Sequence, residues 1–249
     1  GEHVDALLVR ERYKVVRVID SREDYAFAEA VDILDRETGS CLLNLYEGPL
    51  LRRYLPCFDH LKGCAAFQAM FLEGESLVAV FRDCSGTPID QVFYLGDDHS
   101  WRDRLYYAGQ LCREVLNLSD LPAEAACALL LSENVLVDRL DRKIALRFHL
   151  VPMEEMNFRE AAYLAGDQIR KILRPRLSSP REELEFLDEL DRGSCLGPVQ
   201  FYALWRSWEK RIRGAYEALE KKNYVRRWCS LLVGRLRRWG ARRKRGGSR

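Results

Sequence analysis

Two different spacings of apolar residues divide the chain into a strand-rich first part and a helical second part. Short runs rich in β-branched and aromatic residues, separated by turn residues such as Asp35–Gly39 and Glu73–Glu75, are typical of an antiparallel sheet. The predicted strands cover residues 13–19, 25–34, 40–46, 67–72 and 76–81. Residues 82–88 contain Gly86 and Pro88 and predict a linker.

Apolar residues at helical spacing dominate the rest of the chain. The predicted helices cover residues 49–62, 101–116, 158–173, about 180–190 with a serine N-cap before Pro180, 198–219 and 221–245. The first of these contains Pro56, which we expect to kink or break its interior.

Residues 129–149 break this helical pattern. A polar cluster ends at Asn134, and Val135–Val137 then predicts a buried strand because it is apolar and mostly β-branched. Asp138–Asp141 predicts a tight turn, and Ile144–Phe148 the returning strand.

This stretch resembles the catalytic segment of the protein kinase family, which reads H-R-D-x-x-x-x-N, strand, turn, strand, D-F-G. Ser132-Glu-Asn-Val-Leu-Val-Asp138 matches the end of that loop and the strand after it. With Asn134 as the loop asparagine, H-R-D aligns with Cys127-Ala-Leu129 and D-F-G with Arg147-Phe-His149.

The resemblance covers roughly residues 12–216 and implies an α+β, two-lobed kinase-like fold. It predicts a small β-rich N-lobe over residues 1–85 and a helical C-lobe over 86–220, followed by a basic C-terminal helix in 221–249.

The residues that perform phosphoryl transfer in the family are replaced here. The phosphate-binding lysine aligns with Asn44 or Leu45, the catalytic base with Leu129, and the metal-binding aspartate with Arg147. There is no glycine from Glu2 to Thr38 to form a phosphate-binding loop, and the helix predicted at 49–62 has no glutamate. The resemblance therefore implies a catalytically inactive pseudokinase without cofactor or metal.

Two of these positions remain open to more than one interpretation. Asn134 either retains some contact with a nucleotide or metal, or serves only as a turn or capping residue. Arg147 either pairs with an acid where a metal would lie, or faces solvent. If the protein is active, an atypical phosphotransferase would have to use relocated acids such as Glu133 or Asp138.

Charge is distributed unevenly along the 249 residues, although the net charge is only +2. Residues 221–249 hold 12 of the 40 lysines and arginines and no acid, which leaves about −10 on the remainder. A basic segment with tryptophan and leucine at helical spacing suits an anionic membrane surface. The predicted contact residues are Arg226, Arg227, Trp228, Leu231, Leu232, Arg235, Leu236, Arg237, Arg238 and Trp239. Packing onto the body, nucleic-acid binding, and a cytoplasmic flank at 242–245 for a spanning helix are the alternatives.

Eight cysteines without C-x-x-C spacing predict free thiols in a reducing compartment. No signal peptide and no apolar run of bilayer length are visible, and a first residue that is Gly1 and not Met suggests a fragment. We therefore expect a cytoplasmic protein that acts as a signalling scaffold and binds a protein partner, at the inner face of a membrane if residues 221–249 bind lipid. A nucleic-acid-associated adaptor is the third alternative.

Overall fold

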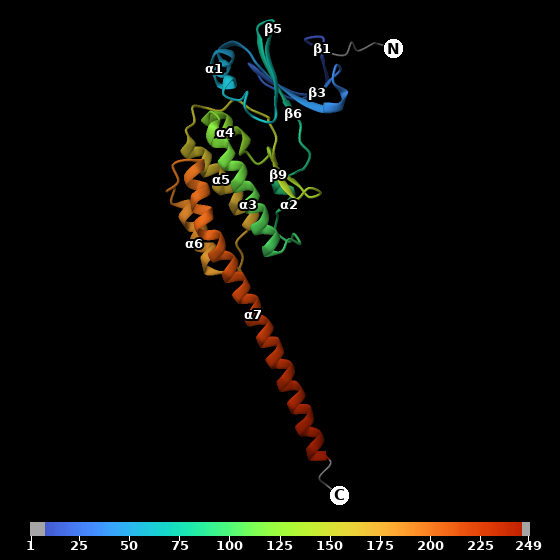
Figure 1. Cartoon of the computed structure of the whole chain (residues 1–249), viewed down its shortest axis with the longest axis vertical. Helices are drawn as coiled ribbons and strands as arrows, with labels where there is room; N and C mark the ends of the chain where they lie inside the picture. The colour runs from blue at the N-terminus through green and yellow to red at the C-terminus, as the bar shows by residue number, and fades with distance from the viewer. Residues whose placement is uncertain (1–7, 246–249) are drawn as a thin grey trace.

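The chain forms two lobes joined by residues 83–86, and a long helix projects from the second lobe (Figure 1). The computed structural model describes residues 8–245. In Figure 1 the strands of the first lobe lie at the top, the helices of the second lobe lie below them, and α7 extends downwards. The arrangement follows from the two spacings of apolar residues, since strands and helices bury their apolar sides on separate elements.

The first lobe is built on a six-stranded antiparallel sheet with the order β1-β2-β3-β4-β6-β5. Its strands are β1 (Leu8–Val9), β2 (Tyr13–Ser21), β3 (Tyr25–Asp32), β4 (Ser40–Tyr46), β5 (Phe67–Glu73) and β6 (Ser76–Arg82). The predicted strands are confirmed, but β3 ends at Asp32 and not at residue 34. The Asp32 carboxylate ends it locally, because it accepts the Leu34 amide at 3.0 Å and pairs with Arg12 at 2.8 Å.

The sheet has two different faces. Phe27, Leu42 and Tyr46 belong to a core that continues into the helical lobe, whereas Tyr13 and Leu43 belong to a smaller cluster on the other face. Because side chains alternate along a strand, this alternation decides which residues of β4 point towards the second lobe.

Helix α1 (Gly48–Asp59) connects β4 to β5 along the chain and packs against β4 and β6. Pro56 lies inside the helix, which continues past it as far as Asp59. The expectation that Pro56 breaks the helix interior is therefore wrong. The proline lies in the last turn, where its missing N–H removes one hydrogen bond close to an end that would fray in any case.

The second lobe is mainly helical, with a small sheet of order β7-β8-β9 beside the linker. Its elements are β7 (Thr87–Pro88), α2 (Ile89–Val92), α3 (Trp101–Asn117), α4 (Ala123–Leu129), β8 (Val135–Asp138), β9 (Lys143–Leu146), α5 (Phe158–Leu173), α6 (Arg181–Asp191) and α7 (Pro198–Arg245). Two short 3₁₀ turns lie at 36–38 and 118–120. Every residue of β8 is buried, as the sequence predicted for Val135–Val137.

Local capping explains two of the helix starts. The Ser100 side chain accepts the Asp103 amide at the start of α3, and Asn157 with Glu160 forms a capping box at the start of α5. The serine N-cap predicted for α6 is wrong. Pro180 holds the N-cap position, and the Ser179 hydroxyl instead accepts the Arg176 amide at 3.0 Å, within the preceding turn.

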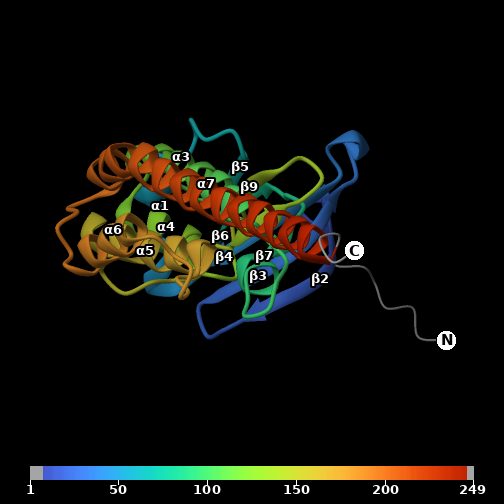
Figure 2. The same ribbon diagram turned by 90° about the horizontal axis from the view of Figure 1, so that it is seen from below.

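Helix α7 is one continuous helix of 48 residues, and not the two helices predicted for 198–219 and 221–245. Its first part packs against α3, α5 and α6, and Figure 2 shows α7 running alongside α3. All described side chains from Glu217 to Trp239 are exposed. The helix does not stop where the body ends, because residues 217–223 contain neither glycine nor proline. Within residues 8–245, no helix combines the length and the apolar character that crossing a bilayer requires.

Candidate functional site

The candidate site lies between the lobes, where β3 and β4 face residues 147–150. Asn44 is fully buried on β4 and its side chain points towards the second lobe. Leu45, the other position considered for the lysine, packs with the cluster on the opposite face. Of the two positions predicted to align with the phosphate-binding lysine, the alternation along β4 therefore leaves Asn44 as the one that faces the second lobe.

The Asn44 amide makes three hydrogen bonds, of which two join the lobes and one stays within the first lobe. Its Nδ2 donates to the Phe148 carbonyl at 2.9 Å. Its Oδ1 accepts the Tyr25 hydroxyl at 2.8 Å and the Leu150 amide at 2.9 Å. Both polar atoms of the side chain are therefore committed to protein groups.

Two tyrosines support this connection from the sheet. The Tyr46 hydroxyl donates to the Leu150 carbonyl at 2.5 Å, beside the bond from Tyr25 to Asn44. Burial raises the pKa of both phenols well above its ordinary value, so they remain protonated donors.

Leu129 and Asn134 are both buried and contact other parts of the protein. Leu129 is fully buried at the end of α4, where an acid would be required for catalysis. Asn134 is buried, and its Nδ2 donates to the carbonyls of Ala128 and His149 at 2.8 and 2.9 Å. These bonds support the interpretation of Asn134 as a residue that ties loop segments together. Its Oδ1 is buried without a hydrogen-bond partner among the described residues.

Arg147 pairs with acids of the first lobe, which decides between its two predicted roles. Its guanidinium lies 2.8 Å from Glu29 on β3 and 3.5 Å from Asp83 in the linker. It also lies over the Phe27 ring, with 5.5 Å from Cζ to the ring centroid. The position aligned with the metal-binding aspartate is therefore occupied by a cation that is already neutralised.

The two residues after Arg147 stack against the sheet. Phe148 stacks on Phe81 with centroids 4.8 Å apart, and His149 stacks on Phe27 at 4.0 Å. His149 Nε2 lies 3.4 Å from an Asp20 carboxylate oxygen, although this contact lacks the angle of a hydrogen bond. Burial lowers the pKa of His149, against the opposing effect of Glu133 and Asp20, so the imidazole is neutral at pH 7.

Helix α1 is attached to the second lobe without the glutamate that the family uses there. Arg53 pairs with Glu124 of α4 at 2.9 Å and donates to the Met153 carbonyl. Tyr54 accepts the Met153 amide at 3.1 Å through its hydroxyl oxygen. These contacts hold α1 against the segment after His149 in a single position.

The residues of this cleft do not fit ATP with Mg²⁺. Phosphate and magnesium require a lysine, carboxylates and backbone amides that approach the phosphates. Here Nδ2 and Oδ1 of Asn44 both bind protein groups, and Arg147 would repel a metal ion. Among residues 8–245, no three His, Cys, Asp or Glu side chains are grouped so as to hold a metal.

The acids considered for relocated catalysis lie elsewhere. Asp138 is buried in the turn between β8 and β9, where its Oδ1 accepts the amides of Leu140 and Asp141, both at 3.1 Å. Glu133 is more than half exposed, 4.0 Å from His149 Nδ1. Asp138 therefore stabilises a turn, and Glu133 borders the cleft from the solvent side.

Thiol chemistry also finds little support in this part of the fold. All eight cysteines are free thiols. Burial raises the pKa of Cys41 and of Cys84 to about 11, which keeps both protonated and weakly nucleophilic at neutral pH.

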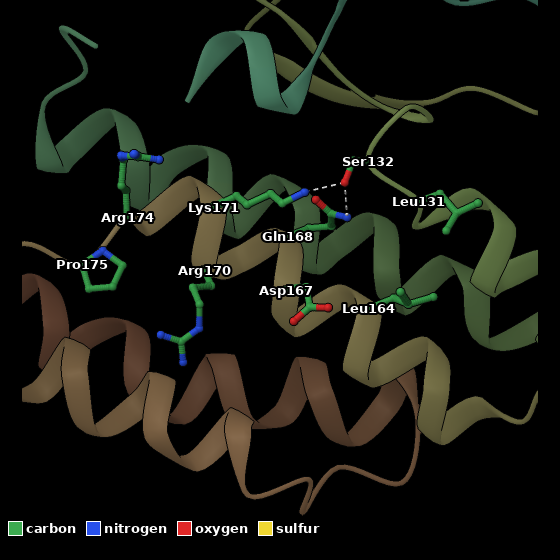
Figure 3. A pocket seen from close by; sticks show the side chains of 9 residues that line it. All are labelled: Leu131, Ser132, Leu164, Asp167, Gln168, Arg170, Lys171, Arg174 and Pro175. Carbon is green, nitrogen blue, oxygen red and sulfur yellow. Dashed lines mark hydrogen bonds between the residues drawn. The ribbon is translucent and has the colours of Figure 1, made fainter. Parts of the chain in front are cut away.

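A separate concavity of about 470 Å³ lies between α5 and the loop before β8 (Figure 3). Lys171 and Gln168 both donate to the Ser132 hydroxyl at its centre. Two of its basic groups are paired, since Lys171 lies 3.0 Å from Asp90 and Arg170 contacts Asp191, and Arg174 also lines the concavity. The arrangement ties α5 to α2 and α6.

The residues predicted for membrane contact lie on the projecting part of α7. Trp228, Leu231, Leu236 and Trp239 are each more than half exposed, and Leu232 is 39% exposed. Arg226, Arg227, Arg235 and Arg237 are exposed along the same segment, whereas the side chain of Arg238 lies outside the described residues.

A β-rich lobe, a helical lobe and a cleft bordered by residues 134–150 define a kinase-like fold. In agreement, the fold is similar to that of the kinase domain of Mycobacterium tuberculosis PknI, in the crystal structure of a double mutant. The TM-score is 0.55 at 14% sequence identity, covering 84% of this chain and all of that one. No protein-family model and no curated protein sequence matches the chain. At this identity the similarity shows the fold, which confirms the two-lobed α+β prediction.

Several residues that build the site were not identified from the sequence. Tyr25, Tyr46, Arg53 and Glu29 lie far along the chain from their partners, and nothing in their local pattern marks them. A tyrosine within an apolar strand is the one available signal, because a buried hydroxyl needs a hydrogen-bond partner.

Proposed function

We propose that this protein is a catalytically inactive kinase-like domain that acts as a protein-binding scaffold in signalling. The observation that carries the proposal is the bonding of Asn44, both polar atoms of which bind protein groups, namely Tyr25, Phe148 and Leu150, where the family binds phosphate. A scaffold needs a constant surface, and the contacts of Asn44, Arg147 and Arg53 hold the lobes and α1 in one arrangement.

We further propose that the scaffold is held at the cytoplasmic face of a membrane by residues 221–249. Support comes from the twelve basic residues of this segment and from the exposed tryptophans and leucines among them. Each basic residue near an anionic surface contributes about 1 kcal/mol, so several together would anchor the protein.

The first test measures the melting temperature of the purified protein with increasing ATP in the presence of Mg²⁺. A ligand at a hundred times its Kd stabilises the native state by about 2.7 kcal/mol, which appears as a rise of several degrees. We expect no rise at millimolar ATP, because Asn44 and Arg147 leave neither a phosphate site nor a metal site. An active protein kinase measured in parallel provides the positive control.

A rise that grows with ATP and requires Mg²⁺ would contradict the proposal and favour the atypical phosphotransferase. In that case Glu133→Gln should reduce transfer of labelled phosphate, since Glu133 is the exposed acid at the cleft. A rise with ATP that does not require Mg²⁺ would indicate nucleotide binding without the metal that phosphoryl transfer needs. It would contradict the expectation that the cleft has no site for a nucleotide.

A further inference from the structure

Helix α7 presents its apolar side to the body in its first part and to solvent in its second part. The body-facing residues are spaced by three or four positions and are almost fully buried. They are Phe201, Trp205, Trp208, Ile212 and Tyr216. Because an α-helix has 3.6 residues per turn, this spacing defines one side of a straight helix.

Continuing the same spacing beyond Tyr216 passes Leu219, which is 39% exposed, and then reaches residues that are polar, basic or very small. These positions are Asn223, Arg226, Ser230, Gly234 and Arg237. Most apolar residues of the second part lie on roughly the opposite side of the helix, at about 100° per residue, and Val233 is the exception. They are Tyr224, Val225, Trp228, Leu231, Leu232, Leu236 and Trp239, each between 39% and 71% exposed.

The outer side of the first part continues this stripe towards Pro198. Its exposed residues are Val199, Ala203, Arg206, Lys210, Gly214 and Glu217, which include two basic residues and one acid. The outer side of α7 therefore changes from mixed small, apolar and charged residues near the body to mainly apolar residues beyond it.

We propose that α7 lies flat on an anionic membrane surface, with its outer side against the lipid and the two lobes on the water-facing side. The inference rests on the proposed membrane location and adds the orientation of the protein. The orientation follows from the continuity of α7. Because the helix is unbroken, its repeat of 3.6 residues per turn places the apolar residues of the second part, here called the Trp–Leu stripe, on the side opposite the body.

Charge selects the lipid surface as the occupant of this stripe. Residues 221–249 have twelve basic residues and no acid, so a second copy would bring like charges into contact. Tryptophan and leucine flanked by arginine suit the headgroup boundary of an anionic bilayer. The acidic body, at about −10, is best placed away from such a surface.

The test rotates residues 222–249 relative to the body by inserting alanines before them, which leaves the sequence of these residues unchanged. Two alanines inserted after Lys221 turn the rest of the helix by about 200°, whereas seven alanines turn it by about 700°, which nearly restores the original side. In each chain, Arg206 and Lys210 are replaced by glutamine, and binding to phosphatidylserine-containing vesicles is compared with binding to neutral vesicles.

With α7 flat, Arg206→Gln with Lys210→Gln weakens binding of the unmodified chain and of the seven-residue insertion. A basic residue at an anionic surface contributes about five-fold in affinity, so the pair should cost roughly 25-fold. In the chain with two inserted alanines, positions 206 and 210 face water when the Trp–Leu stripe is buried in lipid. We therefore expect the same paired substitution to weaken vesicle binding by less than about three-fold. Arg52→Gln with Lys62→Gln, exposed on the first lobe, serves as the matched control and should have no effect.

Three outcomes would overturn the inference, and they can be told apart. An equal effect of the paired substitution in all three chains, or no effect in any, would reject the orientation while leaving membrane binding intact. Absence of binding to anionic vesicles by the unmodified chain would reject the proposed location as well. Competition by duplex DNA that survives Trp228→Ala with Trp239→Ala would identify nucleic acid as the partner.

Discussion

At the residue scale, the side-chain amide of Asn44 holds together a part of the cleft that charged side chains occupy in an active kinase. It joins β4 to β3 and to the segment after Arg147, and it does so through three neutral hydrogen bonds. Neutral partners can be buried at little cost when each donor and acceptor is matched. The cleft is therefore held by a network that leaves no charge for a phosphate.

Replacing Asn44 with leucine, which has a similar size, should strongly destabilise the protein. The Tyr25 hydroxyl, the Leu150 amide and the Phe148 carbonyl would each lose a partner in the core. A buried unsatisfied group costs about 1–3 kcal/mol, so the loss of three partners should lower the free energy of unfolding by roughly 3–9 kcal/mol in urea denaturation. Asn223→Leu, on the exposed part of α7, should change it by less than about 0.5 kcal/mol. A loss at Asn44 as small as that of the control would show the network to be unimportant.

The packing of α6 against α7 shows at the element scale how a buried acid can make stability depend on pH. Glu183 is 1% exposed and accepts the Tyr216 hydroxyl at 2.7 Å. Burial raises the pKa of Glu183, against the opposing hydrogen bond from Tyr216. Its folded pKa is therefore higher than its unfolded value, so its contribution is most favourable at low pH and is lost as pH rises through the folded pKa.

Glu183→Gln should remove this dependence while keeping an acceptor for Tyr216. The variant should match the parent at pH 4 and exceed its melting temperature at pH 8, because only the parent then buries a charged carboxylate. Thermal unfolding at pH 4, 6 and 8 measures the difference, with Asp188→Asn on the exposed side of α6 as the control. A variant less stable than the parent at pH 8 would indicate that the carboxylate is needed there.

The whole molecule combines a clamped body with a long helix, α7, whose second part takes no part in the core. Arg53–Glu124 and Arg147–Glu29 join the lobes, whereas every described side chain of residues 221–237 is exposed. Apolar burial, the main source of folding stability, is therefore confined to the body. The charge of the molecule divides at the same place, with about −10 before residue 221.

Removing residues 221–249 should leave the melting temperature of the body within about one degree of the parent, since only exposed surface is lost. The same truncation should abolish binding to anionic vesicles. In the intact chain this binding should fall steeply as salt is added, because charges on the surface act over about 8 Å at physiological ionic strength. A fall of several degrees on truncation would show that the tail packs as core.

Local chemistry by itself determined the elements of this protein. The alternation of apolar residues placed the strands, the Asp138–Asp141 turn joined β8 to β9, and Asn157 with Glu160 defined the start of α5. Such signals act over a few residues, through backbone hydrogen bonds and side-chain caps that need no distant partner. The order of these elements, together with the segment around Asn134, was enough to predict two lobes.

The tertiary structure decided what the site contains and which way α7 faces. Asn44 meets Phe148 and Leu150 across 104 and 106 residues, and Arg147 meets Glu29 across 118. No local pattern encodes such pairs, because each side chain is compatible with solvent until the lobes bring it to its partner. The side on which the apolar residues beyond residue 220 lie is likewise set by the folded body, since packing at Phe201–Tyr216 fixes how the continuous helix is turned.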